Sequence, residues 1–596
     1  MIPITVPYLK LHSSFRAIIR KLRFISWISY NICFCKAALI LLGKFCFLSA
    51  TKLLAYHLFD SHSNHIDQFA GLIFSHKLVD IAVVAVLITY LTDYPRNYNV
   101  VEAARLVNLQ EGISASTVIF LTCIPDAFSG RLNVIFYSTI SCILGLVLLF
   151  ITAFEAAASP LLKRLILIGV VLLAVGKAGM QHFLGPFLAD QLRAHEPIKL
   201  NISEHRVSAR KRVWWLIPFF FSVIASVQLS SWRVISTFTA SATGITLFIF
   251  RLGIRFFHST EITGPAAGSS LAVVFRVVKA ALSKRHLNNP YSSNQLYRND
   301  QNQVHLFPQV KFFRWLDKAA IIEPSTTLIS PEEQEKAGRL CTVAQVRDTK
   351  LMLKMVPIWT TFVVFGLIVS TGQTFFPEQG NQLNPKGFIT YLLVIQHLSR
   401  VFGNFLCNRL LSKWIPEAKQ KGAKIVRILA GMVLSTICCA VAWRVEVHRL
   451  IIINNKGLLD NTDEVIPMSI FWLAPQFCLL GLMQGLARDG INKFLTDQFP
   501  EPMHDCVSAI TELVTGFASF VNIVSVYFNK SLFADTLNSS RLDEYYKMLT
   551  IVRFINICYF WWISTFYTRG DDTAEADVIP QATGREEEED FKVIVV

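Results

Sequence analysis

This sequence of 596 residues has little charge for its length, since only 17% of its residues are Asp, Glu, Lys or Arg. Ordinary soluble chains carry roughly 25%. Hydrophobic residues reach 53% and the mean hydropathy is +0.43, which excludes a soluble enzyme. The chain also lacks a Walker loop, a G-x-S-x-G elbow and an H-E-x-x-H pair, so we expect neither an ATP-driven pump nor an enzyme.

The 12 cysteines show no spacing typical of zinc ligands or disulfides, and most of them lie within apolar runs. We therefore expect no metal and no cofactor. The formal charge of +15 is spread over short connections between apolar runs, without a basic stripe interleaved with exposed aromatic residues. This distribution is typical of the cytoplasmic loops of a membrane protein and argues against nucleic acid as a partner.

Twelve apolar runs are long enough to cross a bilayer as helices. They lie near 69–91, 111–128, 133–155, 163–185, 213–231, 234–254, 353–372, 387–408, 425–444, 468–492, 507–528 and 547–567. The sequence thus predicts an all-α membrane protein with two six-helix bundles, at 69–254 and 353–567. A cytosolic central loop at 255–352 joins them, and an acidic cytosolic tail follows at 568–596.

Lys and Arg gather in the connections at 192–212 and 409–427, which places both termini and the central loop in the cytoplasm. The leader at 1–68 is basic, and its first 59 residues contain no Asp or Glu. Its apolar part at 26–56 is compatible with an interfacial or re-entrant helix, a thirteenth span or a transit peptide. The first is favoured because Lys36 and Lys44 would be unfavourable at the bilayer centre.

Several motifs occur in a characteristic order along the chain. They are Tyr90-Leu91-Thr92, Asp126 with Gly130-Arg131, Phe187-Leu188-Ala189-Asp190-Gln191, Phe313 to Ala320, Cys341 to Val346, Pro357-Ile358-Trp359, Pro475-Gln476-Phe477 and Asp497-Gln498-Phe499-Pro500. From about 69 to 567 their order resembles the plant nitrate/peptide transporters, the proton-coupled oligopeptide transporter family of the major facilitator superfamily. The resemblance implies alternating access to a midplane solute site in a monomer within a lipid bilayer. It also implies a gating role for Asp126, Gly130 and Arg131.

The sequence departs from this family where proton coupling is expected. The first helix of the family usually carries E-x-x-E-(K/R), and the matching residues here are Ile73, His76 and Lys77. Other positions usually held by ionisable coupling groups carry Gln181, Gln484 and Lys493. A proton carrier needs a group that gains and loses a proton as the cavity opens and closes. Coupling is therefore expected to be weakened or rerouted.

Other ionisable residues inside the predicted helices are candidates for a functional site, because such residues usually face a bundle interior. Lys77 and Asp80 can form a pair on one helix face, or contact the solute or a proton. Glu512 is either a relocated proton site or the partner of a neighbouring base, and Arg488 and Asp489 are expected to form a local pair. Lys177, His397 and Arg400 complete the list of cavity candidates.

If His76, Lys77, Lys177 and Lys493 share one cavity, the field there is positive and attracts anions. The sequence therefore favours a transporter of a small polar or anionic solute, with nitrate or an organic anion ahead of a peptide. Two alternatives stay open: a proton symporter that uses Asp80 or Glu512, and a non-transporting sensor. The expected location is the plasma membrane or a vacuolar or other internal membrane.

Overall fold

The computed structural model describes fifteen stretches of the chain between residues 66 and 576. They are 66–93, 96, 98–123, 130–153, 160–194, 202–229, 232–253, 270–288, 295–299, 311–323, 330–385, 388–416, 420–458, 465–500 and 503–576. The predictions made for the leader before 66, for Asp126 and for the tail after 576 therefore fall outside the described residues.

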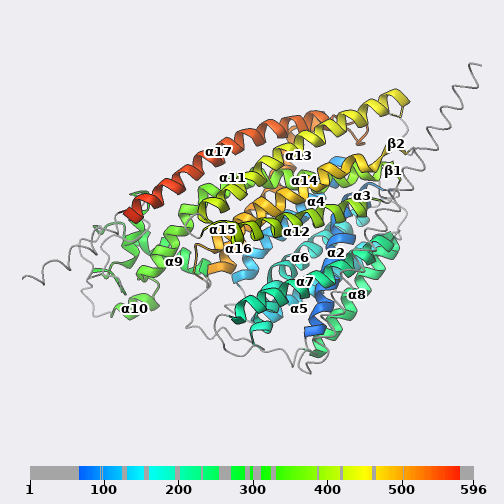
Figure 1. Ribbon diagram of the computed structural model, residues 1–596. Coiled ribbons are helices and arrows are strands. Elements are labelled where there is room, and N and C mark those ends of the chain that lie inside the picture. The colour runs from blue at the N-terminus through cyan, green and yellow to red at the C-terminus, as the bar shows by residue number, and fades with distance from the viewer. Residues whose placement is uncertain are drawn as a thin grey trace, which may run out of the picture.

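The first half of the described chain consists of long helices, because a membrane helix satisfies all its backbone groups internally. They are α2 (Ile66–Ala82), continued by η1 (Val84–Val86) and α3 (Leu87–Thr92), then α4 (Val100–Cys123), α5 (Gly130–Thr152), α6 (Pro160–Ala194), α7 (Ile202–Gln228) and α8 (Trp232–Gly253). Helix α5 packs along α6, and α2 packs against α7 and α8 (Figure 1).

The second half repeats this design. Its helices are α11 (Val343–Asn381), α12 (Ile389–Trp414), α13 (Gln420–Lys456), α16 (His504–Phe528) and α17 (Leu542–Ala576), together with an interrupted segment of η7 (Ile470–Leu473), α14 (Ala474–Met483), η8 (Gln484–Arg488) and α15 (Asp489–Thr496). A short η10 (Lys530–Leu532) follows α16. The η8 turn is π-helical, a feature that often occurs at functional sites.

The two halves pack side by side, with α4 of the first lying directly against α16 of the second (Figure 1). At one end of the molecule, β1 (Leu383–Asn384) pairs in parallel with β2 (Ile466–Ser469). At the other end lie α9 (Ser270–Ser283), η5 (Lys311–Ala320) and α10 (Pro331–Lys336). These ends are called the β end and the α9 end below.

The central segment between the halves contains a small hydrophobic core of its own. Residues of α9 and η5 pack there with Val346 at the start of α11. The buried Lys350 ammonium lies 2.5 Å from the Asp317 carboxylate, and Lys284 donates a hydrogen bond to the carbonyl of Ile321 at 2.6 Å. Helix α11 begins here, earlier than the predicted 353, because Thr342 caps its first turn.

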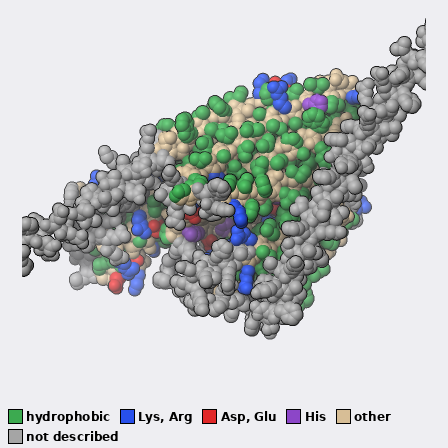
Figure 2. Space-filling model, viewed as in Figure 1, with side chains coloured by type: hydrophobic (Ala, Val, Ile, Leu, Met, Phe, Trp, Pro, Cys, Tyr) green, Lys and Arg blue, Asp and Glu red, His purple; other side chains and the backbone are tan. Residues whose placement is uncertain are grey.

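Eight helical segments among the described residues are long and apolar enough to cross a membrane. The remaining long helices, α4, α6, α7 and α12, pack in the same body. Figure 2 shows hydrophobic side chains covering the flank of the molecule, while charged ones gather toward its ends and in a hollow of this face. The exposed Phe554, Trp561 and Trp562 of α17 belong to this apolar surface, as expected for contact with lipid.

One helix boundary differs from the prediction in a way that matters for function. The second helix was expected at 111–128, yet α4 spans Val100–Cys123. The segment from Val100 onward contains Glu102 and Arg105, which lowers its hydropathy although it is helical. As a result Glu111, which the prediction placed at the helix start, lies in the middle of α4.

Close helix contacts depend on glycine at the junction of α12 and α14. A Cβ atom on Gly481 would lie 2.0 Å from the carbonyl oxygen of Gln396, so a side chain there must push the helices apart. We expect Gly481→Val to lower stability by about 1–3 kcal/mol, measured as thermal unfolding of the purified protein in detergent. Gly244→Ala in α8 is the control, because a Cβ atom there meets nothing within 4 Å. An unchanged melting temperature for Gly481→Val would contradict the tight packing.

Candidate solute cavity

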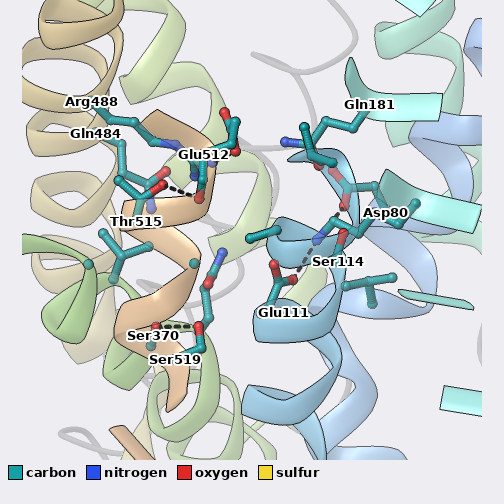
Figure 3. A pocket seen from close by; sticks show the side chains of 18 of the residues that line it. Asp80, Glu111, Ser114, Gln181, Ser370, Gln484, Arg488, Glu512, Thr515 and Ser519 are labelled. Atoms are coloured by element: carbon teal, nitrogen blue, oxygen red, sulfur yellow. Dashed lines mark hydrogen bonds and ion pairs between the residues drawn. The ribbon is translucent and has the colours of Figure 1, made fainter. Parts of the chain in front are cut away.

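A cavity of about 350 Å³ lies between the two halves. Helices α2, α4 and α6 line it from the first half, and α11, α12, α16 and the η8–α15 segment line it from the second. Figure 3 shows Asp80, Glu111, Ser114 and Gln181 on one wall, facing Gln484, Arg488 and Glu512 on the other. The site is therefore built by elements that are far apart in the sequence.

Two carboxylates share one ammonium group on the first wall. Lys177 of α6 donates a short hydrogen bond to the carboxylate of Glu111 in α4, and its Nζ lies 3.6 Å from the carboxylate of Asp80 in α2. The Lys177 side chain is only 10% exposed, and those of Asp80 and Glu111 are 24% and 21% exposed. This triad carries one more negative charge than positive charge when both carboxylates are ionised.

The opposite wall contains two arginine–carboxylate pairs. Arg488 of η8 pairs with Glu512 of α16. Arg400 of α12 donates to both oxygens of Asp489, at 2.6 and 3.2 Å. A guanidinium has five N–H donors, so this bidentate pair leaves Arg400 further donors for an anionic group in the cavity. Each of these two pairs is neutral when its carboxylate is ionised.

The two halves also meet on either side of the cavity. Toward the α9 end, Arg131 of α5 bridges Asp190 of its own half and Asp505 at the start of α16. Toward the β end, Thr92 donates a hydrogen bond to Glu378 at 2.9 Å. Arg131, for which the family resemblance implies a gating role, therefore contacts the other half through Asp505. Asp126 of the same motif lies outside the described residues.

Most of the predicted cavity residues line the cavity, but three do not. Those lining it are Asp80, Lys177, Gln181, His397, Arg400, Gln484 and Glu512. His76 is buried elsewhere in α2, and the Lys77 ammonium lies over the ring of Trp215 in α7, 5.2 Å from its centroid. Lys493 is exposed, because successive residues of a helix point about 100° apart and its neighbour Asn492 is the one that lines the cavity.

Two predicted local pairs are replaced by pairs between helices. Asp80 forms its ion pair with Lys177 of α6, not with Lys77 of its own helix. Arg488 and Asp489 do not pair with each other, since Arg488 binds Glu512 and Asp489 binds Arg400. Side chains at i and i+1 do not face each other on a helix, which is the reason the second prediction is wrong.

The condition on which the predicted positive field depended is not met. Of the four bases on which it depended, only Lys177 lines the cavity, and two carboxylates surround it. The sequence reasoning missed Glu111 because the second helix was started at that residue. The sequence did contain a signal, because residues 103–108 are largely apolar. A helix extended back over them places Glu111 in its middle.

A helical body with a charged cavity between two halves, which contact each other toward both ends, has the fold of the major facilitator superfamily. Solved structures support this fold. PepTSo, described as a POT family transporter, matches with a TM-score of 0.56 and 14% identity over 86% of this chain and 98% of its own. A POT family transporter in complex with 5-aminolevulinic acid matches with a TM-score of 0.52 and 13% identity over 85% of this chain and 96% of its own.

The sequence comparisons establish the family. The family model described as the POT family matches residues 132–538, which is more than half of the chain. Protein NRT1/PTR FAMILY 5.5 of Arabidopsis thaliana is 28% identical over 502 residues, covering 81% of this chain and 93% of the relative. Protein NRT1/PTR FAMILY 5.4 of the same plant is 26% identical over 521 residues, covering 81% and 90%. The chain belongs to the POT family and is a multi-pass membrane transporter.

Proposed function

We propose that this transporter carries small zwitterionic solutes by alternating access, and that proton coupling runs through the Asp80–Lys177–Glu111 triad. The observation that carries the proposal is the excess of one carboxylate over its shared ammonium. Proton coupling thus moves away from the positions held by Ile73, His76 and Gln484. It runs instead through Asp80 of α2, Glu111 of α4 and Lys177 of α6.

The coupling step follows from the cost of dehydrating charge. When the cavity closes, an unpaired negative charge on the first wall must leave water, which is unfavourable in a low-dielectric interior. One proton shared by Asp80 and Glu111 leaves the triad neutral, so the closed forms are reached more readily with a proton bound. Lys77 does not neutralise the excess through an ion pair, since its ammonium lies over Trp215.

The solute class follows from the separation of charge across the cavity. The first wall is acidic and suits a solute ammonium, while Arg400 on the second wall has donors left for a solute carboxylate. The structural relative that binds 5-aminolevulinic acid handles a molecule with both groups. The sequence favoured nitrate and organic anions because four bases were expected in the cavity. Only one of these bases, Lys177, lines it, so that reason no longer applies.

The deciding experiment is flux into proteoliposomes of the purified protein, with and without an imposed proton gradient. We expect a dipeptide or 5-aminolevulinic acid to accumulate when the gradient is applied, and nitrate not to accumulate. Nitrate flux that ignores the gradient would overturn both the solute class and the coupling. No flux of any solute would favour a non-transporting sensor.

Arg400 gives a direct test of solute orientation. Replacing Arg400 by glutamine removes a charge-assisted contact with a solute carboxylate, worth about 1.5–3 kcal/mol. We expect KM for a zwitterionic solute to rise by roughly 10- to 100-fold. Lys493→Gln, which removes an exposed cation outside the cavity, should leave KM unchanged. Equal effects of the two variants would contradict the assigned site.

A further inference from the structure

Beyond the cavity, a second acidic group connects the two halves at the β end. Glu378, near the end of α11, is 3% exposed and accepts a hydrogen bond from the hydroxyl of Thr92, the last residue of α3, at 2.9 Å. Asn381, one turn later in α11, donates to the carboxylate of Asp93 at 2.9 Å. Two carboxylates, one from each half, therefore lie at the same junction.

In the part of the chain that the structure describes, neither carboxylate forms an ion pair, and the nearby cations Arg449 and Arg96 act on them from a greater distance. Among the described residues, no Lys, Arg or His lies within 4.0 Å of the Glu378 carboxylate, and Asp93 adds a like charge nearby. Arg449 of α13 also faces this region, but its guanidinium donates to both oxygens of the buried Glu446. On the Asp93 side, the Arg96 guanidinium stacks on the ring of Tyr90 at 3.8 Å.

Hydrogen bonds hold the end of α11, which carries Glu378, against other helices of its own half. A change of charge on Glu378 is therefore expected to change its contact with α3 of the other half. The next residue, Gln379, donates to Glu446 at 2.6 Å and accepts a hydrogen bond from Gln476 at 3.0 Å. These contacts, together with the ion pair of Arg449 and Glu446, tie the end of α11 to α13 and α14. Buried hydrogen-bond networks of this kind stiffen the elements that they join. The partner that can move is α3, which belongs to the other half.

We propose that Glu378, with Asp93 nearby, is a second proton-binding site that locks the two halves together at the β end. With both carboxylates ionised, the closed junction holds the buried Glu378 carboxylate without an ion-pair partner and with the like charge of Asp93 nearby, which favours separation and hydration. One bound proton removes the repulsion and allows the Thr92 contact to persist. The closed form therefore binds the proton more tightly than the open form, and by linkage acid pH favours closure at this end.

This site rests on the alternating-access movement proposed above, but not on coupling through the Lys177 triad. It adds a dependence on absolute pH to transport, separate from any dependence on the proton gradient. The two can be told apart because Glu378 lies beyond the cavity lining, whereas Asp80 and Glu111 are part of it.

The test measures the distance across the β end without any gradient. Spin labels are attached at Arg105→Cys in α4 and Lys456→Cys in α13, both exposed positions, after the reactive native cysteines are replaced by serine. The protein is placed in nanodiscs and double electron–electron resonance is recorded between pH 8 and pH 5. We expect the short-distance population to increase about tenfold relative to the long one as the pH falls.

Three variants decide the outcome. Glu378→Gln should hold the short distance at both pH values, because the amide keeps the hydrogen bond without the charge. Glu102→Gln, an exposed acid in the first turn of α4, should keep the wild-type shift. Glu111→Gln should still show a pH-dependent change at the β end, even if driven uptake is lost, because Glu378 is intact in that variant. The same pH shift in Glu378→Gln as in the wild type, or no shift in the wild type, would overturn the proposal.

Discussion

Lys177→Met is expected to abolish solute uptake and to destabilise the protein. The substitution leaves the carboxylates of Asp80 and Glu111 at a partly buried site without their shared cation. Breaking a buried ion pair by removing one partner costs about 3–5 kcal/mol, so transport should fall by at least roughly 100-fold. The measurement is initial uptake of a zwitterionic solute into proteoliposomes, normalised to folded protein.

Two further variants separate a folding defect from a functional one. Lys177→Met combined with Glu111→Gln removes the repulsion, so we expect thermal stability to recover while gradient-driven uptake stays absent. Lys163→Met is the matched control, because Lys163 lies 3.9 Å from Glu102 in an exposed pair, and such pairs contribute little. Uptake near the wild-type level in Lys177→Met would remove the triad from the mechanism.

Asp80→Asn and Glu111→Gln are expected to uncouple transport from the proton gradient while exchange continues. Either change leaves one carboxylate for one ammonium, so the triad is neutral without a bound proton. The closed forms are then reached without proton uptake. Accumulation driven by a gradient should disappear, whereas counterflow of labelled solute between equal pH values should persist.

The proton-relay role considered for Glu512 provides the contrast. Among the described residues, Arg488 is the one ion-pair partner of Glu512, so Glu512→Gln creates an unpaired guanidinium and should impair counterflow as well as accumulation. If Glu512→Gln loses only the gradient dependence and the two triad variants retain it, the coupling site lies on the second wall. That result would leave the alternating-access assignment intact and would move the proton path.

Much of the fold followed from local properties of the chain. The helical segments correspond to the apolar runs, because a bilayer leaves backbone groups no partner outside a helix. The division into two halves followed from the polar stretch between the runs. The interruption at Gln484–Arg488 did not, since a π-helical turn depends on how α14 packs against α12 and α13.

The membership of individual residues in the site was decided by tertiary structure. Sequence reasoning selected Lys177, Arg400 and Glu512 because charges inside membrane helices are rare, and all three line the cavity. It could not choose their partners, because every ion pair of the cavity joins different helical elements. Nearest neighbours along a helix were the only partners visible in the sequence.

The sequence by itself determined a membrane protein of two helical halves and marked the charged positions inside it. Hydropathy and helix length fix these properties residue by residue, without long-range information. Only the tertiary structure decided that Glu111 and Asp80 share Lys177, and that Glu378 meets Thr92 across the halves. The balance of charge in a cavity depends on which helices face each other, and packing of the whole chain sets that arrangement.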